Sequence, residues 1–270
     1  MPKLKVSDIE MYYESMGEGV PVVLVTGYGM DLFAWTLQAP ALSQDYRVYM
    51  NDNRGVGLTD KPDGPYTIKM MADDLAGLFK AADIDRAHLV GHSMGGMIAQ
   101  QLALDRPDLL RSLTLASTTC RVPRGAELLL MQWTDILEKL GNEGFVNNIL
   151  AWGFTFEFVD TQYESLMMFR QMMLDHFNER PIPPHSFRSQ CAAATTFNLS
   201  DDIKNIRVPT MVLVGRGDIL TPPRFSEEIT ERIPGSFLKI IDGGHAFNNE
   251  VPAAFNQALL EFFENHSPPP

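Results

Sequence analysis

The chain has 270 residues, of which 45% are hydrophobic and 21% are charged. This is the composition of an ordinary globular protein, and it excludes a disordered chain, which would be richer in charge and poorer in apolar residues. With 34 acidic and 22 basic residues, the formal net charge is −12. Because an acidic chain repels nucleic-acid phosphates and anionic membrane surfaces, we expect neither as a partner.

Cysteine content and the first residues favour an intracellular location. Cys120 and Cys191 are too few for a disulfide framework, and we interpret them as small buried residues in a reducing compartment. Met1–Lys5 contains no apolar stretch that could act as a signal peptide. The longest early apolar run, Val20–Val25, is far too short to span a bilayer. We therefore expect a soluble cytoplasmic protein.

Apolar runs typical of strands alternate along the chain with segments of helical period. Strands that alternate with helices predict an α/β fold, in which helices flank a mostly parallel central sheet. The predicted strands are Lys3–Ser7, Met11–Glu14, Val20–Thr26, Tyr46–Asp52, His88–Gly91, Arg111–Ala116, Pro209–Gly215 and Phe237–Ile241. The predicted helices among them are Leu32–Ser43, Thr67–Ala82, Met94–Leu104, Pro223–Ile233 and Pro252–Glu264.

One long stretch, from about residue 121 to residue 205, contains no convincing strand. Its predicted helices are Glu127–Leu140, Phe145–Leu150 and Tyr163–Asn178. The last of these is apolar on nearly every side, which predicts burial on more than one face. We interpret residues 121–205 as a helical cap inserted into a core formed by residues 1–120 and 206–270. The alternative is a helical extension of the core that has no role in binding.

The motif Gly91-His92-Ser93-Met94-Gly95 lies between a predicted strand and a predicted helix. In this context a G-x-S-x-G sequence forms a sharp turn, which projects the serine hydroxyl above the edge of the sheet. Glycines two residues either side of Ser93 remove Cβ atoms that would clash with the neighbouring strand and helix. Ser93 is therefore a candidate nucleophile, and the N-terminus of the following helix would favour negative charge there.

A serine is a poor nucleophile without a base, and the base needs an acid to orient it. Two later loops supply both groups at the carboxyl ends of predicted strands, where open α/β sheets build their sites. Asp218 ends the segment Val212–Asp218, and His245 follows Asp242 and two glycines. Asp242 is the alternative acid, but we favour its interpretation as a turn former ahead of those glycines.

Taken in chain order, these motifs resemble the α/β-hydrolase fold over nearly the whole chain. The matching segments are Asp52–Gly57, Gly91–Gly95, Gly215–Asp218 and Gly243–His245. The resemblance implies that Ser93 is the nucleophile, His245 the general base and acid, and Asp218 the group that orients His245. Some members carry the acid after the preceding core strand, but the segment Ser117–Cys120 at that place contains no carboxylate.

The resemblance also implies an oxyanion hole made of two backbone N–H groups. One belongs to Met94, directly after the nucleophile, and the other to Tyr28, in the loop Thr26–Gly29. Members of the family usually have histidine where this chain has Thr26. We therefore expect the backbone donor to be kept and the loop to be supported in a different way.

Asp52 and Arg54 lie in a loop after a predicted strand. They could clamp a substrate anion, but we favour a buried ion pair that holds this loop below the site. No cluster of histidines has the spacing of zinc ligands, and we expect neither a metal nor another cofactor.

The candidate pocket residues are four aromatic side chains and the histidine beside the nucleophile: Trp35, His92, Trp133, Phe197 and Phe247. Together with the methionines of the predicted cap, they favour a substrate with an apolar acyl or ring portion over a sugar or a phosphate. The cap also holds few positive charges that could bind an anion.

These residues predict acyl transfer from a small-molecule ester or lactone, with an acyl-enzyme that water then hydrolyses. A serine nucleophile argues against epoxide hydrolases and haloalkane dehalogenases, which use aspartate at that position. Among capped members with serine, the motifs are most similar to esterases and to hydrolases of the 3-oxoadipate enol-lactonase type. The main alternatives are a carbon–carbon bond hydrolase of ring-cleavage products and a non-catalytic receptor for a small lactone. Cofactor-free oxygenases and haloperoxidase-like perhydrolases also resemble this pattern. The sequence does not decide between a monomer and a homodimer.

Overall fold

The fold comes from a computed structural model, which describes residues 3–267. Within these residues, an eight-stranded sheet has the strand order β1-β2-β4-β3-β5-β6-β7-β8. The β1–β2 and β2–β4 pairs are antiparallel, and the later neighbours are parallel, so the predicted mostly parallel sheet is confirmed. The strands are β1 (Lys3–Val6), β2 (Ile9–Met16), β3 (Val20–Val25), β4 (Tyr46–Asn51), β5 (Ala87–His92), β6 (Leu110–Ala116), β7 (Thr210–Gly215) and β8 (Phe237–Ile241).

Helices flank this sheet, and one group of them follows β6 directly. Outside that group the helices are η1 (Leu32–Trp35), α1 (Ala39–Leu42), α2 (Ile68–Ala81), α3 (Met94–Asp105), η2 (Pro107–Leu109), η3 (Ile203–Asn205), α8 (Pro223–Arg232), α9 (Phe247–Glu250) and α10 (Pro252–Glu264). The group between β6 and β7 consists of α4 (Arg124–Gly153), α5 (Phe156–Thr161), α6 (Tyr163–Glu179) and α7 (Pro184–Thr195). Among residues 3–267, no helix has both the length and the apolar character needed to cross a bilayer.

The central strands are apolar on both sides, so each face of the sheet is covered. Val23 and Val25 of β3 share one apolar cluster with side chains of α2, α3 and α8. Val22 and Leu24 share a second cluster with side chains of α1 and α10. Because successive residues of a strand point to opposite faces, β3 separates two cores. The carboxyl ends of the central strands are thereby held in fixed positions.

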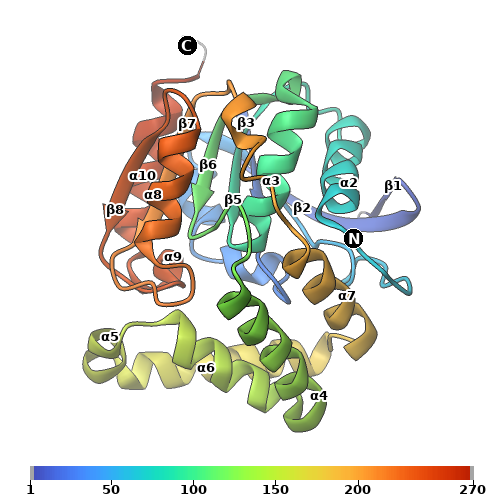
Figure 1. Cartoon of the computed structure of the whole chain (residues 1–270), viewed down its shortest axis with the longest axis vertical. Coiled ribbons are helices and arrows are strands. Elements are labelled where there is room, and N and C mark those ends of the chain that lie inside the picture. The colour runs from blue at the N-terminus through green and yellow to red at the C-terminus, as the bar shows by residue number, and fades with distance from the viewer. Residues whose placement is uncertain (1–2, 268–270) are drawn as a thin grey trace.

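We call residues 121–205 the cap, and Figure 1 shows its helices gathered along one end of the sheet. The chain passes from β6 into the cap and back beside the isolated bridge between Arg121 and Asn198. The break between the first two predicted cap helices falls at Gly141, where φ is 66° and ψ is −161° inside α4. Phe145 and Phe187 of the cap join the same apolar cluster as β3. Cap and sheet are therefore packed against each other over a continuous apolar interior.

The prediction that the third cap helix is buried on more than one face is wrong. In α6 the buried side chains are Leu166, Met173 and Phe177, whereas Met168 and Met172 are 65% and 52% exposed. The helix packs along one side against α4 and leaves its other side in solvent. In α6, apolar residues on nearly every side of the helix therefore do not correspond to burial on every side. The helices α5 and α7 have no counterpart among the predicted elements.

The predicted ion pair between Asp52 and Arg54 is also wrong, because Arg54 pairs with a different carboxylate. The Arg54 guanidinium donates to both carboxylate oxygens of Asp74 on α2, at 2.6 and 2.8 Å. Asp52 instead accepts hydrogen bonds from the N–H groups of Leu32 at 2.9 Å and Leu58 at 2.7 Å. The loop after β4 is thus held to α2 by charge and to η1 by the Asp52 carboxylate.

We expect Asp74→Ala to lower the free energy of unfolding by about 3 kcal/mol, because loss of one partner strands a buried charge. Arg54 is 2% exposed and would keep its contacts with the exposed Asp8 carboxylate at 2.7 Å and with the Tyr66 ring, whose centroid lies 5.6 Å from the guanidinium carbon. The control is Asp73→Ala on the same helix, which breaks an exposed pair with Lys69 and should cost less than about 0.5 kcal/mol. Urea unfolding of both variants measures the difference, and equal losses would contradict the role given to the buried pair.

Candidate active site

Ser93 occupies the tight turn between β5 and α3 with φ 56° and ψ −120°. Residues other than glycine seldom adopt a positive φ, and such strain costs on the order of 1–3 kcal/mol unless the surroundings impose it. Here the end of β6 holds the turn on both sides. The Ser93 N–H donates to the Ala116 carbonyl at 2.9 Å, and the Thr118 hydroxyl donates to the Ser93 carbonyl at 2.7 Å.

The two glycines of the motif are required because backbone lies too close for a side chain. A Cβ on Gly91 would lie 2.3 Å from the Gly95 carbonyl oxygen. A Cβ on Gly95 would lie 2.2 Å from the Val25 carbonyl oxygen, at the end of β3. The steric role predicted for these glycines is confirmed.

The loops after β7 and β8 bring an aspartate and a histidine to the same end of the sheet. His245 Nδ1 lies 2.9 Å from Asp218 Oδ2, and both residues are buried. Ser93 and His245 line one cavity. Among residues 3–267, no hydrogen bond joins Ser93 to His245, and such contacts often tighten only when substrate is bound. Asp242 pairs instead with Arg216 at 3.2 Å on the exposed surface.

The Asp218 carboxylate has a hydrogen-bond donor on each oxygen besides the imidazole. Oδ1 accepts from the N–H groups of Leu220 at 2.9 Å and Thr221 at 2.8 Å. Oδ2 accepts from the Thr221 hydroxyl at 2.8 Å. Burial raises the pKa of Asp218, but the neighbouring His245 and these hydrogen bonds outweigh it and hold the pKa below its usual value. The carboxylate therefore stays ionised beside the imidazole.

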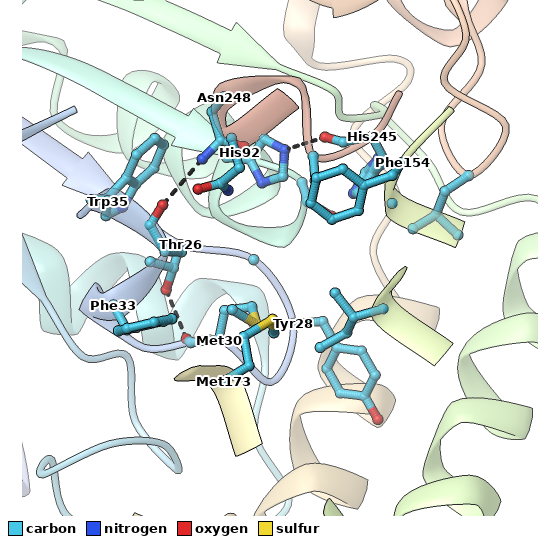
Figure 2. Close-up of a pocket in the computed structure, with 18 of the residues that line it drawn as sticks. Thr26, Tyr28, Met30, Phe33, Trp35, His92, Phe154, Met173, His245 and Asn248 are labelled. Carbon is cyan, nitrogen blue, oxygen red and sulfur yellow. Dashed lines mark hydrogen bonds between the residues drawn. The ribbon is translucent and has the colours of Figure 1, made fainter. Parts of the chain in front are cut away.

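His92, directly before Ser93, holds the loop that carries His245. Its Nε2 lies 2.9 Å from the His245 carbonyl oxygen, as the dashed line in Figure 2 marks. Because a carbonyl only accepts, Nε2 carries the proton and donates it. Burial lowers the pKa of His92 to about 3, with a further contribution from His245. His92 is therefore a neutral donor that fixes the backbone of the neighbouring histidine.

The loop after β3 is supported by side chains that replace the usual histidine of the resembling family. The Thr26 hydroxyl donates to the Met30 carbonyl at 2.8 Å, and the Asn53 amide donates to the Thr26 carbonyl at 3.1 Å. The side chain of Tyr28 points into the cap, where its ring stacks on Phe187. Within the described part of the chain, neither the Tyr28 N–H nor the Met94 N–H donates to another group. Two backbone donors are thus left for a ligand.

A cavity of about 100 Å³ lies between these loops and the cap. Figure 2 shows His92, His245 and Phe154 along one side of it and Met30 and Met173 along the other. Among the described residues, its lining contains no Asp, Glu, Lys or Arg. Its largest apolar side chains come from the loop after β3, the cap and the Asp218 loop: Met30, Phe33, Trp35, Leu130, Trp133, Ile149, Phe154, Phe169, Met173 and Leu220.

A family model described as the alpha/beta hydrolase fold matches residues 20–250. The chain belongs to the α/β-hydrolase fold family. The predicted fold class is therefore confirmed, and the protein is a hydrolase of this family.

Similar proteins share this fold over nearly their full length. A relative from Azorhizobium caulinodans, proposed by its name to be the carbamate hydrolase RutD, is 30% identical over 97% of this chain and 98% of its own. The enol-lactonase from Burkholderia xenovorans LB400 is 27% identical, with a TM-score of 0.88, over 97% of this chain and 100% of its own. Est816, described as an N-acyl homoserine lactone degrading enzyme, is 30% identical, with a TM-score of 0.81, over 97% and 100%.

Some of the predicted pocket residues line the cavity and others do not. Trp35, His92 and Trp133 line it. Phe197 and Phe247 do not, and both are corrections. Phe197 packs in the apolar cluster where α7 returns to the core, and Phe247 packs against Phe255 at 5.1 Å behind the site. Among the described residues, no group of three or more His, Cys, Asp or Glu is placed to hold a metal ion.

Sequence reasoning missed the aromatic wall that the cap and the loop after β3 build together. The imidazole of His176 on α6 lies 2.7 Å from the carboxylate of Asp31, which caps η1 by accepting from the Phe33 N–H at 3.0 Å. Phe33 also stacks on His176, with ring centroids 4.5 Å apart. The Gly29 N–H donates to Gln190 of α7 at 2.9 Å. The one feature of the sequence that could have identified Phe33 as a cavity residue is its position shortly after the loop Thr26–Gly29.

We expect Thr221→Val to lower kcat/KM about tenfold on any substrate that the wild type hydrolyses, because a hydrogen bond to a charged group contributes about 1.5–3 kcal/mol and the other donors to Asp218 remain. Thr221→Ser keeps the hydroxyl and should retain activity within about twofold. Steady-state kinetics and thermal melting of both variants make the comparison. If serine is as damaging as valine, the methyl group rather than the hydrogen bond matters.

Proposed function

We propose that the protein is a serine hydrolase that cleaves a carboxylic ester or lactone through an acyl-enzyme. The observation that carries this proposal is the arrangement of three side chains. Ser93 stands on the strained turn and lines the same cavity as His245, whose Nδ1 pairs with the buried carboxylate of Asp218. Serine, aspartate and histidine in this chain order form the arrangement that activates a hydroxyl in this fold.

In the first step, neutral His245 accepts the Ser93 proton at Nε2, because Nδ1 is committed to Asp218. The serine oxygen attacks the substrate carbonyl, whose oxygen becomes an oxyanion. The Tyr28 and Met94 N–H groups, which donate to nothing else described, are the candidate donors to it. One such donor typically contributes about 10²–10³ in rate.

In the second step, the protonated imidazole returns its proton to the leaving alkoxide, which becomes the free alcohol of an ester or the tethered hydroxyl of an opened lactone and leaves Ser93 acylated. A water molecule then attacks the acyl group while His245 takes its proton. Collapse of this second tetrahedral intermediate releases the acid and restores the serine hydroxyl. Throughout, the ionised Asp218 stabilises the imidazolium and keeps it oriented.

The cavity lining supports a substrate whose body carries no charge. A substrate carboxylate would lose its hydration among phenylalanine, tryptophan and methionine side chains without a cation to pair with. The names of the enol-lactonase and of Est816 support a lactone or a related ester as the bond that is cleaved. We therefore infer an uncharged, largely apolar ester or lactone.

We expect Ser93→Ala and His245→Ala each to lower kcat about 10⁴–10⁶-fold on any ester or lactone that the wild type hydrolyses, since the two residues act as a unit. The substrate panel is p-nitrophenyl esters of rising acyl length, an enol-lactone, an N-acyl homoserine lactone and a ring-cleavage diketone.

Three outcomes would contradict the proposal. If the Ser93→Ala variant were as active as the wild type, Ser93 would not be the nucleophile. Cleavage of the diketone alone would favour the carbon–carbon bond hydrolase. A single slow turnover together with a ligand-dependent protein partner would favour a lactone receptor.

A further inference from the structure

A second hollow, of about 540 Å³, lies on the outer side of the cavity wall. We call it the α4 groove, because both ends of α4 form it together with the loop between β7 and α8. Its apolar side chains include Leu128, Leu129, Trp152, Ile219, Leu220 and Phe225. Leu128 is 70% and Ile219 56% exposed, so this surface presents apolar area to solvent next to the site.

The wall between the cavity and the α4 groove is one residue thick. Leu220 lines both spaces. On α4, Leu129 lines the groove while the next residue, Leu130, lines the cavity. At the other end of α4, Trp152 lines the groove and the next residue, Gly153, lines the cavity. The groove and the active-site cavity are therefore adjacent along α4, and at Leu220 a single residue separates them.

Leu220 stands between the two hollows, next to the catalytic acid. Its backbone is fixed, because its N–H donates to Asp218 Oδ1 at 2.9 Å. Its side chain is half-buried and faces a hollow on each side. The size of this one side chain therefore bears directly on whether the two hollows connect.

The wall stands on the histidine side of the cavity. The Ala246 N–H, next to His245, donates to the Gly153 carbonyl at 2.7 Å. Leu220 is bonded to the carboxylate that orients the same histidine. His245 must reach the leaving oxygen to return its proton, so the alcohol portion of an ester lies on this side.

We propose that the α4 groove binds a linear alkyl chain on the alcohol side of the substrate, with Leu220 as the specificity-determining residue at its entrance. This inference rests on the proposed ester hydrolysis. An alkyl chain fits because the groove is apolar and joins the cavity at the leaving-group side. Among the described lining residues, Arg224 is the charged one, and its side chain is exposed. Each methylene buried there should raise kcat/KM about fourfold.

The test uses octyl acetate and ethyl octanoate, two isomers that carry the long chain on opposite sides of the same ester. Leu128→Glu places a charge in the groove, and Leu140→Glu is its matched control, an exposed leucine of the same helix outside the groove. We expect Leu128→Glu to lower the ratio of kcat/KM for octyl acetate to that for ethyl acetate about tenfold, and the control to leave it unchanged. Leu220→Ala should raise this ratio about fourfold.

A binding measurement separates this proposal from the proposed function. In the Ser93→Ala background, octyl acetate is titrated against tryptophan fluorescence, because Trp152 lines the groove. Leu128→Glu should weaken its binding about tenfold relative to Leu140→Glu. If Leu128→Glu and Leu140→Glu bind octyl acetate equally and give equal kcat/KM ratios, the proposal that the groove binds the chain is overturned. A larger loss for ethyl octanoate than for octyl acetate overturns the alcohol-side assignment. Selective binding without Ser93-dependent turnover of any ester overturns the hydrolytic function and leaves the chain-binding groove standing.

Discussion

Close backbone packing around Ser93 is the constraint on which the rest of the site depends. The turn holds a positive φ because Gly91 and Gly95 let β3, β5 and α3 approach to distances that a Cβ would forbid. The same approach brings the loop after β3 beside the nucleophile, since a Cβ on Gly27 would lie 3.0 Å from the Ser93 Cβ. The N–H groups of Tyr28 and Met94, which have no acceptor among residues 3–267, are therefore placed by the packing of the sheet and need no side chain of their own.

The cap is joined to two of the loops that carry part of the site, the loop after β3 and the loop after β8. Gln190 accepts from Gly29, His176 contacts Asp31, and the Gly153 carbonyl accepts from Ala246. Glu250, at the end of α9, accepts both the Gly244 N–H at 2.8 Å and the Thr155 N–H of the cap at 3.2 Å. The cap thus shapes the cavity and also fixes the loops, so a change in cap packing acts on the catalytic groups as well as on substrate fit.

How far the sequence could predict this site depends on the range of the interactions involved. The strand–helix alternation follows from local periodicity and the requirement for Gly91 from its approach to Gly95, four residues later, and both predictions agree with the structure. Arg54 was paired with its neighbour Asp52, yet its buried carboxylate partner comes from α2, twenty residues later. The sequence around Phe33 and Phe247 does not show which of the two faces the cavity. The packing of η1, α6 and α10 decides this, and it places Phe33 in the cavity lining and Phe247 in the core. Such choices depend on tertiary contacts that local periodicity does not contain.

The absence of charged side chains from the described cavity lining has a consequence for the chemistry as well as for the substrate. His92 stays neutral because burial lowers its pKa to about 3, so the ion pair formed during the proposed reaction is that of protonated His245 with Asp218. In apolar surroundings this attraction and the hydrogen bonds to an oxyanion are stronger than in water. A substrate anion in the same space would repel both the oxyanion and the Asp218 carboxylate. The lining that admits an uncharged ester would therefore also protect the charge separation on which the proposed attack by Ser93 depends.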